Sequence, residues 1–187
     1  MAPDPLPTSD SRSSTAPAGH HIALIGMMAA GKTTVGREVA RRCGVRFVDT
    51  DDEIEAETGE TVGDLWERHG EEGYRPLERA AVLQALRSTR PVVLATPGGV
   101  VVDPAMAEAV ARADVDTVYL RASARTLAGR VGGGDHRPLL GDDPGTAIVA
   151  LLRERAGRYK DLADVIIDVD DRSPDEVAGA VLVAVAS

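Results

Sequence analysis

The sequence predicts an α/β protein in which helices cover both faces of a five-stranded parallel sheet, so that the chain forms three α/β/α layers. Five short apolar runs with strand character alternate with segments that carry helical signals, and this alternation is typical of parallel sheets. The run at 92–96 reads as a strand buried on both faces, as parallel strands are. The expected strands lie at 21–25, 45–49, 92–96, 117–120 and 165–169.

Helical signals fill the intervals between these strands. Asp103 followed by Pro104 is a typical helix start, because Asp caps free backbone N–H groups and Pro suits the first helical position. Ser173 and Glu176 have the spacing of a capping box. The expected helices lie at 33–42, 51–57, 61–69, 76–87, 103–113, 123–131 and 146–159, with a terminal helix from 173.

Composition and charge limit the class of protein. A chain of 187 residues suits one domain with its own core, and with 3% aromatic residues that core must be aliphatic. A formal net charge of −9 argues against a nucleic-acid partner, which needs a basic face. The single cysteine, Cys43, is expected as a buried, inert thiol and suits a reducing compartment. With no pattern of a membrane span or signal peptide, we expect a cytoplasmic protein without a membrane partner.

The N-terminal residues differ from the rest of the chain. Residues 1–19 are rich in Pro, Ser, Thr and Ala and have almost no bulky apolar side chains. Such a segment gains too little from burial to offset the entropy lost on ordering. We therefore expect a disordered tail at 1–19 and a folded domain at 20–187.

The segment Gly26–Thr33, called the P-loop below, matches the phosphate-binding pattern G-x-x-x-x-G-K-[ST]. It stands between an expected strand and an expected helix, as this motif requires. Its backbone N–H groups and the helix N-terminus can surround nucleotide phosphates. Lys32 can reach the β- and γ-phosphates, and the Thr33 hydroxyl can ligate Mg²⁺. The alternative is a glycine-rich turn with an incidental lysine.

Acidic residues follow the second expected strand at Asp49, Asp51 and Asp52. Because parallel strands end at one edge of a sheet, this cluster should lie beside the P-loop, together with Gly98 and Gly99. One carboxylate there can hold Mg²⁺ or its waters, and another can accept a proton from an attacking hydroxyl. The alternative is that the aspartates only favour the N-terminus of the next helix.

Three arginines are further candidates. Arg75 and Arg155 stand alone in the sequence, and isolated arginines usually lie on a solvated face. Arg137 lies in the glycine-rich segment 132–138, which can close over a nucleotide, exclude water and deliver a charge to a transferring phosphoryl group. The alternative for this segment is a mobile surface loop.

Together these motifs resemble those of shikimate kinase, a family of small P-loop kinases related to nucleoside monophosphate kinases. The resemblance runs from about Ile22 to Val185. Apart from the P-loop each motif is weak alone, but their order and spacing are specific. The segments that carry the resemblance are Gly26–Thr34, Phe47–Asp51, Gly73–Glu78, Pro97–Gly99, His136–Leu140 and Arg155–Tyr159.

The resemblance implies a three-layer P-loop fold with a lid at about 132–145, and it implies catalytic roles. Lys32, Asp51 and Arg137 would be catalytic, with Asp51 acting as, or near, the base for the 3-hydroxyl of shikimate. Asp49 would support Mg²⁺ together with Thr33. These roles come from matching motif positions in this sequence.

The resemblance also implies which residues bind the two substrates. Glu78 would orient Arg75, which with Arg155 would bind the carboxylate of shikimate. The residues implied for shikimate are Asp51, Arg75, Gly98, Gly99 and Arg155. Those implied for ATP are Met28, Ala29, Ala30, Gly31, Lys32, Thr33, Thr34, Arg130, Arg137 and Arg172.

Three features depart from the family pattern. Pro97 replaces the first of three usual glycines, which fixes φ and removes an N–H donor. The P-loop interior, Met27–Ala30, is bulkier than is common. Tyr74 stands where Phe is more usual and places a hydroxyl near the substrate pocket. One interpretation of Tyr74 is therefore that the substrate is an altered cyclitol.

We expect an ATP- and Mg²⁺-dependent kinase that phosphorylates the 3-hydroxyl of shikimate in aromatic amino-acid biosynthesis, and that acts as a monomer. A kinase of another small carboxylated polyol or cyclitol, such as gluconate, is the alternative within enzymes. A nucleotide- or metabolite-sensing module without catalysis is the alternative from another class.

Overall fold

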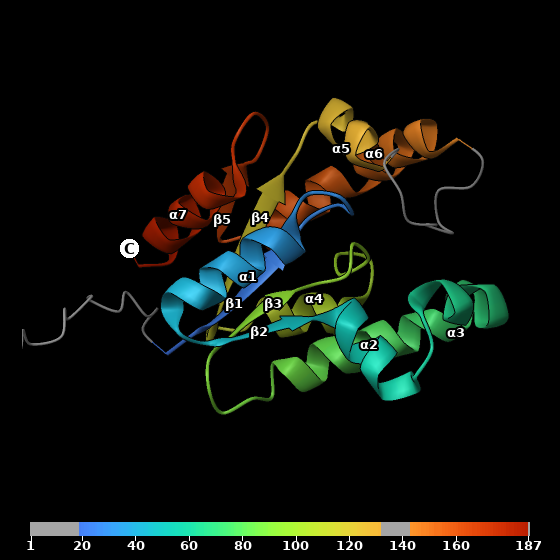
Figure 1. Ribbon diagram of the computed structural model, residues 1–187, viewed down its shortest axis with the longest axis horizontal. Helices are drawn as coiled ribbons and strands as arrows, with labels where there is room; N and C mark the ends of the chain where they lie inside the picture. The colour runs from blue at the N-terminus through green and yellow to red at the C-terminus, as the bar shows by residue number, and fades with distance from the viewer. Residues whose placement is uncertain (1–18, 132–142, 187) are drawn as a thin grey trace, which may run out of the picture.

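The computed structural model describes residues 19–131 and 143–186. The tail expected at 1–19 therefore lies outside the described residues except for Gly19, and so do His136 and Arg137. Figure 1 shows the described chain as a central sheet with helices around it. The strands are β1 (His21–Ile25), β2 (Arg46–Asp49), β3 (Val92–Ala95), β4 (Val115–Arg121) and β5 (Val165–Asp168).

The strands form one parallel sheet in the order β2-β3-β1-β4-β5, which confirms the predicted fold class. The first strand lies at the centre, where Leu24 pairs with Ala95 of β3 on one side and with Val118 of β4 on the other. The P-loop, which follows β1, therefore starts from the middle of the sheet. Loops that follow neighbouring strands stand on either side of it at the same edge.

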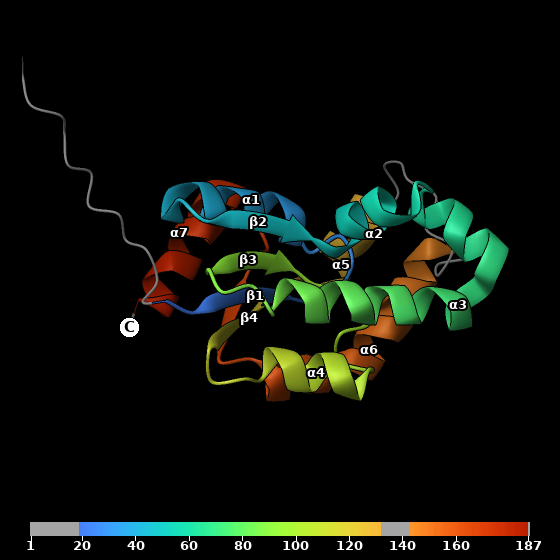
Figure 2. The ribbon, with the colours of Figure 1, turned by 90° about the horizontal axis from the view of Figure 1, so that it is seen from below.

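Helices cover both faces of this sheet (Figures 1 and 2). On one face α1 packs beside α7, and on the other α3 packs beside α4. The helices are α1 (Lys32–Cys43), α2 (Thr50–Thr58), α3 (Val62–Ala85), α4 (Pro104–Val110), α5 (Ala124–Val131), α6 (Pro144–Leu162) and α7 (Pro174–Val185). Several begin at the predicted caps, including Asp103 for α4 and the Ser173–Glu176 capping box for α7.

The prediction for the α3 region was wrong in one respect. The sequence predicts separate helices at 61–69 and from about Pro76. A proline disfavours the helical conformation in the residue that precedes it. In the structure α3 is helical on both sides of Gly70, where φ is 63° and ψ is −170°. Tyr74 and Arg75 are therefore helical residues. Arg75 and Glu78, three positions apart, lie on neighbouring parts of the helix surface.

The start of α6 overlaps the end of the predicted lid at about 132–145. The Asp143 side chain accepts a hydrogen bond from the backbone N–H of Thr146 at 3.1 Å and caps the helix, and Pro144 follows at its first position. Positions 144 and 145 thus belong to α6, and the lid stays a prediction. The rest of the predicted lid, 132–142, lies outside the described residues.

The core is aliphatic, as the composition predicts. Val, Leu, Ile and Ala side chains of β1, β3 and β4 are buried against the helices. Two tyrosines in this main core are exceptions, since Tyr119 and Tyr159 are buried and stacked with ring centroids 5.0 Å apart. Cys43 is buried on α1, and burial raises the pKa of its thiol. Within 19–131 and 143–186, no helix is both long enough and apolar enough to span a bilayer.

Asp103→Ala should lower the free energy of unfolding by about 1–2 kcal/mol, because the buried Asp103 carboxylate caps α4. Its Oδ1 accepts hydrogen bonds from the backbone N–H groups of Ala105 at 2.9 Å and Met106 at 3.0 Å, and its Oδ2 accepts one from Arg79 Nε at 2.8 Å. Burial alone would raise the pKa of Asp103, but Arg79 and the two N–H groups outweigh it and hold the pKa below its usual value.

The cap's contribution should therefore depend on pH. A carboxyl whose pKa is lowered by folding stabilises the protein above the unfolded-state pKa of about 3.9, and this stabilisation is lost as the pH falls below it. Urea unfolding of both proteins should show the full difference at neutral pH and a smaller one at about pH 3. An equal difference at both pH values would contradict this account of Asp103.

Candidate active site

A cavity of about 960 Å³ opens where the loops after β1, β2 and β3 leave the sheet. Segments that are far apart in the sequence meet there, because parallel strands end at the same edge. Arg137 lies outside the described residues. Every other predicted site residue lines the cavity: Met28, Ala29, Ala30, Gly31, Lys32, Thr33, Thr34, Asp49, Asp51, Arg75, Gly98, Gly99, Arg130, Arg155 and Arg172.

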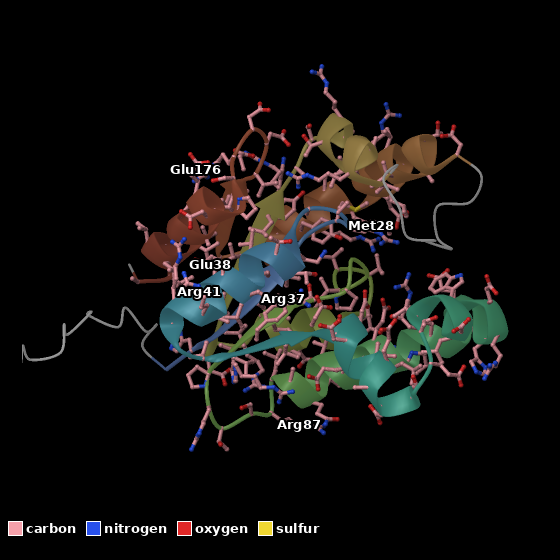
Figure 3. All side chains as sticks on the ribbon, in the orientation of Figure 1. Met28, Arg37, Glu38, Arg41, Arg87 and Glu176 are labelled. Carbon is pink, nitrogen blue, oxygen red and sulfur yellow. The ribbon has the colours of Figure 1, made fainter. Side chains whose placement is uncertain are left out.

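The backbone of the P-loop bends tightly between β1 and α1, where Figure 3 labels Met28. Gly26, Ala29 and Gly31 have positive φ angles of 142°, 63° and 98°. A side chain at Gly26 would come within 2.7 Å of the Leu120 carbonyl oxygen in β4, so this position requires glycine. Left-handed residues next to a helix N-terminus turn successive N–H groups toward one point, which suits an anion.

Two cations bond to the P-loop, and a third lines the same cavity. The buried Lys32 ammonium donates to the carbonyl oxygens of Gly26 and Met27, at 2.9 Å each. Arg130 of α5 donates to two carbonyl oxygens of the same loop at 3.2 and 3.3 Å. Arg172, just before α7, is held by two backbone carbonyls at 3.2 and 3.0 Å. Positive charge therefore comes to the cavity from three separate parts of the chain.

Thr33 and Asp49, the predicted metal ligands, meet beside the P-loop. The Thr33 hydroxyl donates to Asp49 Oδ2 at 2.7 Å. No group of three or more His, Cys, Asp or Glu side chains with metal-binding geometry occurs in the described part of the chain. Mg²⁺ at phosphoryl-transfer sites uses few protein oxygens and takes its other ligands from phosphates and water. The pair of oxygens on Thr33 and Asp49 therefore fits Mg²⁺.

The three aspartates after β2 have different surroundings. Asp49 caps α2, because its Oδ1 accepts the backbone N–H of Asp51 at 3.1 Å. Asp52 pairs with Arg37 at 3.1 Å on an exposed surface. The side chain of Asp51 lines the cavity, and the hydroxyl of Tyr74 donates to its Oδ1 at 3.1 Å. Helix capping therefore accounts for Asp49 but not for the Asp51 carboxylate.

The surroundings of Asp51 raise the pKa of its carboxyl. Water reaches this side chain through the cavity, but the walls remove part of its hydration, and this is the largest cause of the shift. The Asp49 carboxylate raises the pKa further, whereas the Tyr74 hydrogen bond and the Lys32 charge lower it. A carboxylate with a raised pKa is a stronger base, which suits a group that accepts a proton from a hydroxyl.

Arg75 is held by two carboxylates of α3. Its Nη1 donates to Glu78 Oε2 at 2.6 Å, and its Nε and Nη2 donate to Glu71 Oε1 at 3.0 and 2.7 Å. Glu78 is buried, and burial raises the pKa of its carboxyl although the Arg75 charge opposes this. The guanidinium carbon lies 5.8 Å from the ring centroid of Trp66. The guanidinium is thus fixed at the cavity wall, with the exposed Glu71 along one edge.

Arg155 of α6 is buried against the loop that follows β3. Its Nη1 donates to the carbonyl oxygen of Gly98 at 3.2 Å, and the Tyr159 hydroxyl donates to the same oxygen at 2.6 Å. The Arg155 Nε is buried and has no hydrogen-bond partner among the described residues. A buried cation with an unused donor favours an anionic ligand. Arg155 therefore does not fit the alternative of a solvated surface arginine.

Comparison with known proteins identifies the family of this site. The family model described as "Shikimate kinase" matches residues 28–186, which is most of the chain. The chain belongs to the shikimate kinase family. This agrees with the resemblance seen in the sequence motifs.

Individual relatives support the same assignment. A shikimate kinase from Frankia casuarinae is 46% identical over 156 residues, which cover 83% of this chain and 68% of the relative. One from Aromatoleum aromaticum is 45% identical over 148 residues, covering 79% of this chain and 83% of the relative. The solved shikimate kinase from Acinetobacter baumannii in complex with shikimate has a TM-score of 0.84 at 32% identity, over 89% of this chain and 92% of that chain.

Three side chains of this shikimate kinase site were missed from the sequence. Tyr159 supports the Gly98 carbonyl, and its spacing of four residues from Arg155 on α6 was a usable signal. Trp66 lines the cavity next to Tyr74. Glu71 accepts hydrogen bonds from Nε and Nη2 of Arg75, a predicted substrate-binding residue. No motif in the sequence distinguishes Glu71 from the other acidic residues of α3.

Proposed function

We propose that the P-loop side of the cavity holds ATP and that the α3 side holds shikimate. The reaction itself, ATP- and Mg²⁺-dependent phosphorylation of shikimate, follows from membership of the family. The observation that supports the residue assignment is that Asp51 shares one cavity with the P-loop and with Arg75 and Arg155. Phosphoryl transfer to a small hydroxylated acid requires three kinds of group. These are a proton acceptor, a phosphate site and cations that bind the carboxylate of the acid.

On the nucleotide side, the backbone of Met28–Thr34 would bind the phosphates. Thr33 and Asp49 would hold Mg²⁺, which when bound neutralises part of the phosphate charge. Arg130 and Arg172 would contact the nucleotide at the rim of the cavity, where both are held by backbone carbonyls. These assignments explain why the cations gather on this side.

On the acceptor side, Arg75 and Arg155 would bind the carboxylate of shikimate. Planar guanidinium groups bind carboxylates through paired hydrogen bonds. The buried Nε of Arg155 has no hydrogen-bond partner among the described residues and lies 3.9 Å from Glu154 Oε1. At Arg75 the substrate carboxylate would replace the exposed Glu71, while the buried Glu78 continues to orient the guanidinium. Gly98–Gly99 would let the backbone approach the ring.

In the reaction, the 3-hydroxyl oxygen forms a bond to the γ-phosphorus as the bond from that phosphorus to the bridging oxygen of ADP breaks. Asp51 accepts the hydroxyl proton, and Lys32 stabilises the negative charge that spreads over the transferring group. Phosphoryl transfer needs little covalent assistance, so positioning and electrostatics carry most of the acceleration. Arg137, outside the described residues, stays a prediction from its sequence motif.

Gly99→Ala should raise the KM for shikimate about tenfold by disturbing Arg75. A Cβ at Gly99 would lie 2.5 Å from Arg75 Nη1. Hydrogen bonds to Glu71 and Glu78 hold the Arg75 guanidinium in place. Steady-state kinetics should show little change in the KM for ATP. Gly129→Ala is the matched control, because a Cβ there meets nothing within 4 Å. A rise confined to the KM for ATP would contradict the assignment of Arg75.

We also propose that the chain acts as a monomer in the cytoplasm. One chain brings the P-loop, Asp51, Arg75 and Arg155 to a single cavity, so these groups need no second chain to meet. The buried free thiol of Cys43 suits a reducing compartment. Size-exclusion chromatography with light scattering should give a mass near 19.6 kDa. A dimer mass across a range of concentrations would contradict the monomer.

A coupled ADP-release assay tests the proposed function. The full chain is assayed with shikimate, gluconate and quinate, each with and without Mg²⁺. We expect ADP release that requires both shikimate and Mg²⁺. Faster turnover with gluconate or quinate would favour the kinase of another carboxylated polyol, and ATP binding without acceptor-dependent ADP release would favour the sensing module.

A further inference from the structure

Tyr74 carries a buried hydroxyl that has no role in the mechanism above. The side chain is 3% exposed and lies on α3 next to Arg75. Its hydroxyl donates to Asp51 Oδ1 at 3.1 Å, across 23 positions in the sequence. A group bonded directly to the proposed proton acceptor can determine where that acceptor points.

The direction of this hydrogen bond follows from the chemistry of the two groups. An ionised carboxylate only accepts hydrogen bonds, whereas a phenol carries a proton to donate. Burial and the negative charge of Asp51 both raise the pKa of the Tyr74 phenol, so it keeps its proton at neutral pH. A hydrogen bond to an ionised acceptor is stronger than one between neutral groups. Tyr74 is therefore a constant donor to Asp51.

Packing fixes the Tyr74 hydroxyl relative to α2. The ring meets Trp66 edge to face, with centroids 5.6 Å apart and an angle of 63° between the planes. Ile54 of α2 and Leu65 of α3 complete a small apolar cluster around the ring. Because close packing limits a buried aromatic ring to one rotamer, the hydroxyl is a rigid anchor point.

The Asp51 carboxylate has little else to hold it. Within the described residues, the bond from Tyr74 is the only hydrogen bond that this carboxylate accepts. Its second oxygen, Oδ2, is thus available to a ligand in the cavity that the side chain lines. A carboxylate in open solvent would rotate about χ1 and χ2 among several staggered positions.

We propose that Tyr74 is a positioning residue that holds Asp51 with Oδ2 turned to the acceptor hydroxyl. The inference rests on the role of Asp51 in the proposed function. With Oδ1 engaged by the phenol, the proton of the acceptor hydroxyl passes to Oδ2. Without the phenol, Asp51 spends less time in the productive orientation, so the step that transfers the proton and the phosphoryl group slows. Binding of the substrate carboxylate, which Arg75 and Arg155 provide, changes little.

Tyr74→Phe tests this inference, because it removes the hydroxyl and keeps the ring. We expect kcat to fall about tenfold, with shikimate Kd changed by no more than about twofold. Trp66 is the single tryptophan and lines the cavity, so its fluorescence reports shikimate binding independently of turnover. Tyr119→Phe is the matched control, since it removes a different buried tyrosine hydroxyl and should leave kcat unchanged.

A double-mutant cycle with Asp51→Ala separates positioning from a general structural role. If Tyr74 acts through Asp51, Tyr74→Phe lowers kcat in the wild-type background and has no further effect in the Asp51→Ala background. The same fall in both backgrounds would overturn the inference, as would an unchanged kcat or a loss confined to shikimate binding. Wild-type protein without shikimate-dependent turnover would overturn the proposed function and this inference together, so the wild-type rate distinguishes the two failures.

Discussion

Asp51→Asn lowers kcat for shikimate about 10²- to 10⁴-fold, the range lost when a general base is removed. Asparagine has nearly the size of aspartate and its carbonyl oxygen can still accept the hydrogen bond from Tyr74, but it cannot take up a proton. Asp51 lines the cavity and its carboxylate does not cap α2, so the protein keeps its fold. The loss therefore falls on kcat rather than on stability.

The measurement is kcat at saturating ATP and shikimate, with thermal unfolding of both proteins alongside. Glu53→Gln is the matched control, because Glu53 lies on the same helix and pairs with Arg46 at 2.6 Å. It loses the same charge and should retain the wild-type rate. An Asp51→Asn enzyme within about twofold of wild type would remove Asp51 from its assigned role.

Lys32→Ala lowers kcat about 10²- to 10³-fold, as expected when a charge that stabilises the transition state is lost. The ammonium is buried within the P-loop and bonds two of its carbonyl oxygens at 2.9 Å each. Its removal takes a positive charge from the place where phosphate oxygens gather, so the KM for ATP should rise as well.

Lys160→Ala controls for the loss of a lysine, because the chain has only this one other lysine and it is exposed on α6. Kinetics with each substrate varied in turn should show the loss for Lys32→Ala and none for Lys160→Ala. A Lys32→Ala enzyme with normal kcat and normal KM for ATP would contradict the assignment of the P-loop as the nucleotide site.

The fold was predictable because its signals are local. Alternating strands and helices, the caps at Asp103 and Ser173 and the apolar strand runs each act within a few residues. The start of the second half of α3 was not predictable, because tertiary packing outweighs the local effect of Pro76. Tyr74, Glu78 and Val82 stand four positions apart and are all buried, which holds this part of the helix against the proline.

The candidate site was predictable to the extent that its residues are contiguous. The P-loop and the acidic cluster after β2 are short motifs, and their positions in the structure match the prediction. Arg75 and Arg155 are single arginines in the sequence, so only the resemblance to a family marked them. The bond between Tyr74 and Asp51 depends on how α3 is rotated against α2, which no local pattern encodes.

A crystal structure of the full chain with ADP, Mg²⁺ and shikimate tests the central claim most directly. The account predicts the shikimate carboxylate between the guanidinium groups of Arg75 and Arg155, and the 3-hydroxyl within hydrogen-bond distance of Asp51. Shikimate bound with its carboxylate toward the P-loop, or with its 3-hydroxyl out of reach of Asp51, would contradict it.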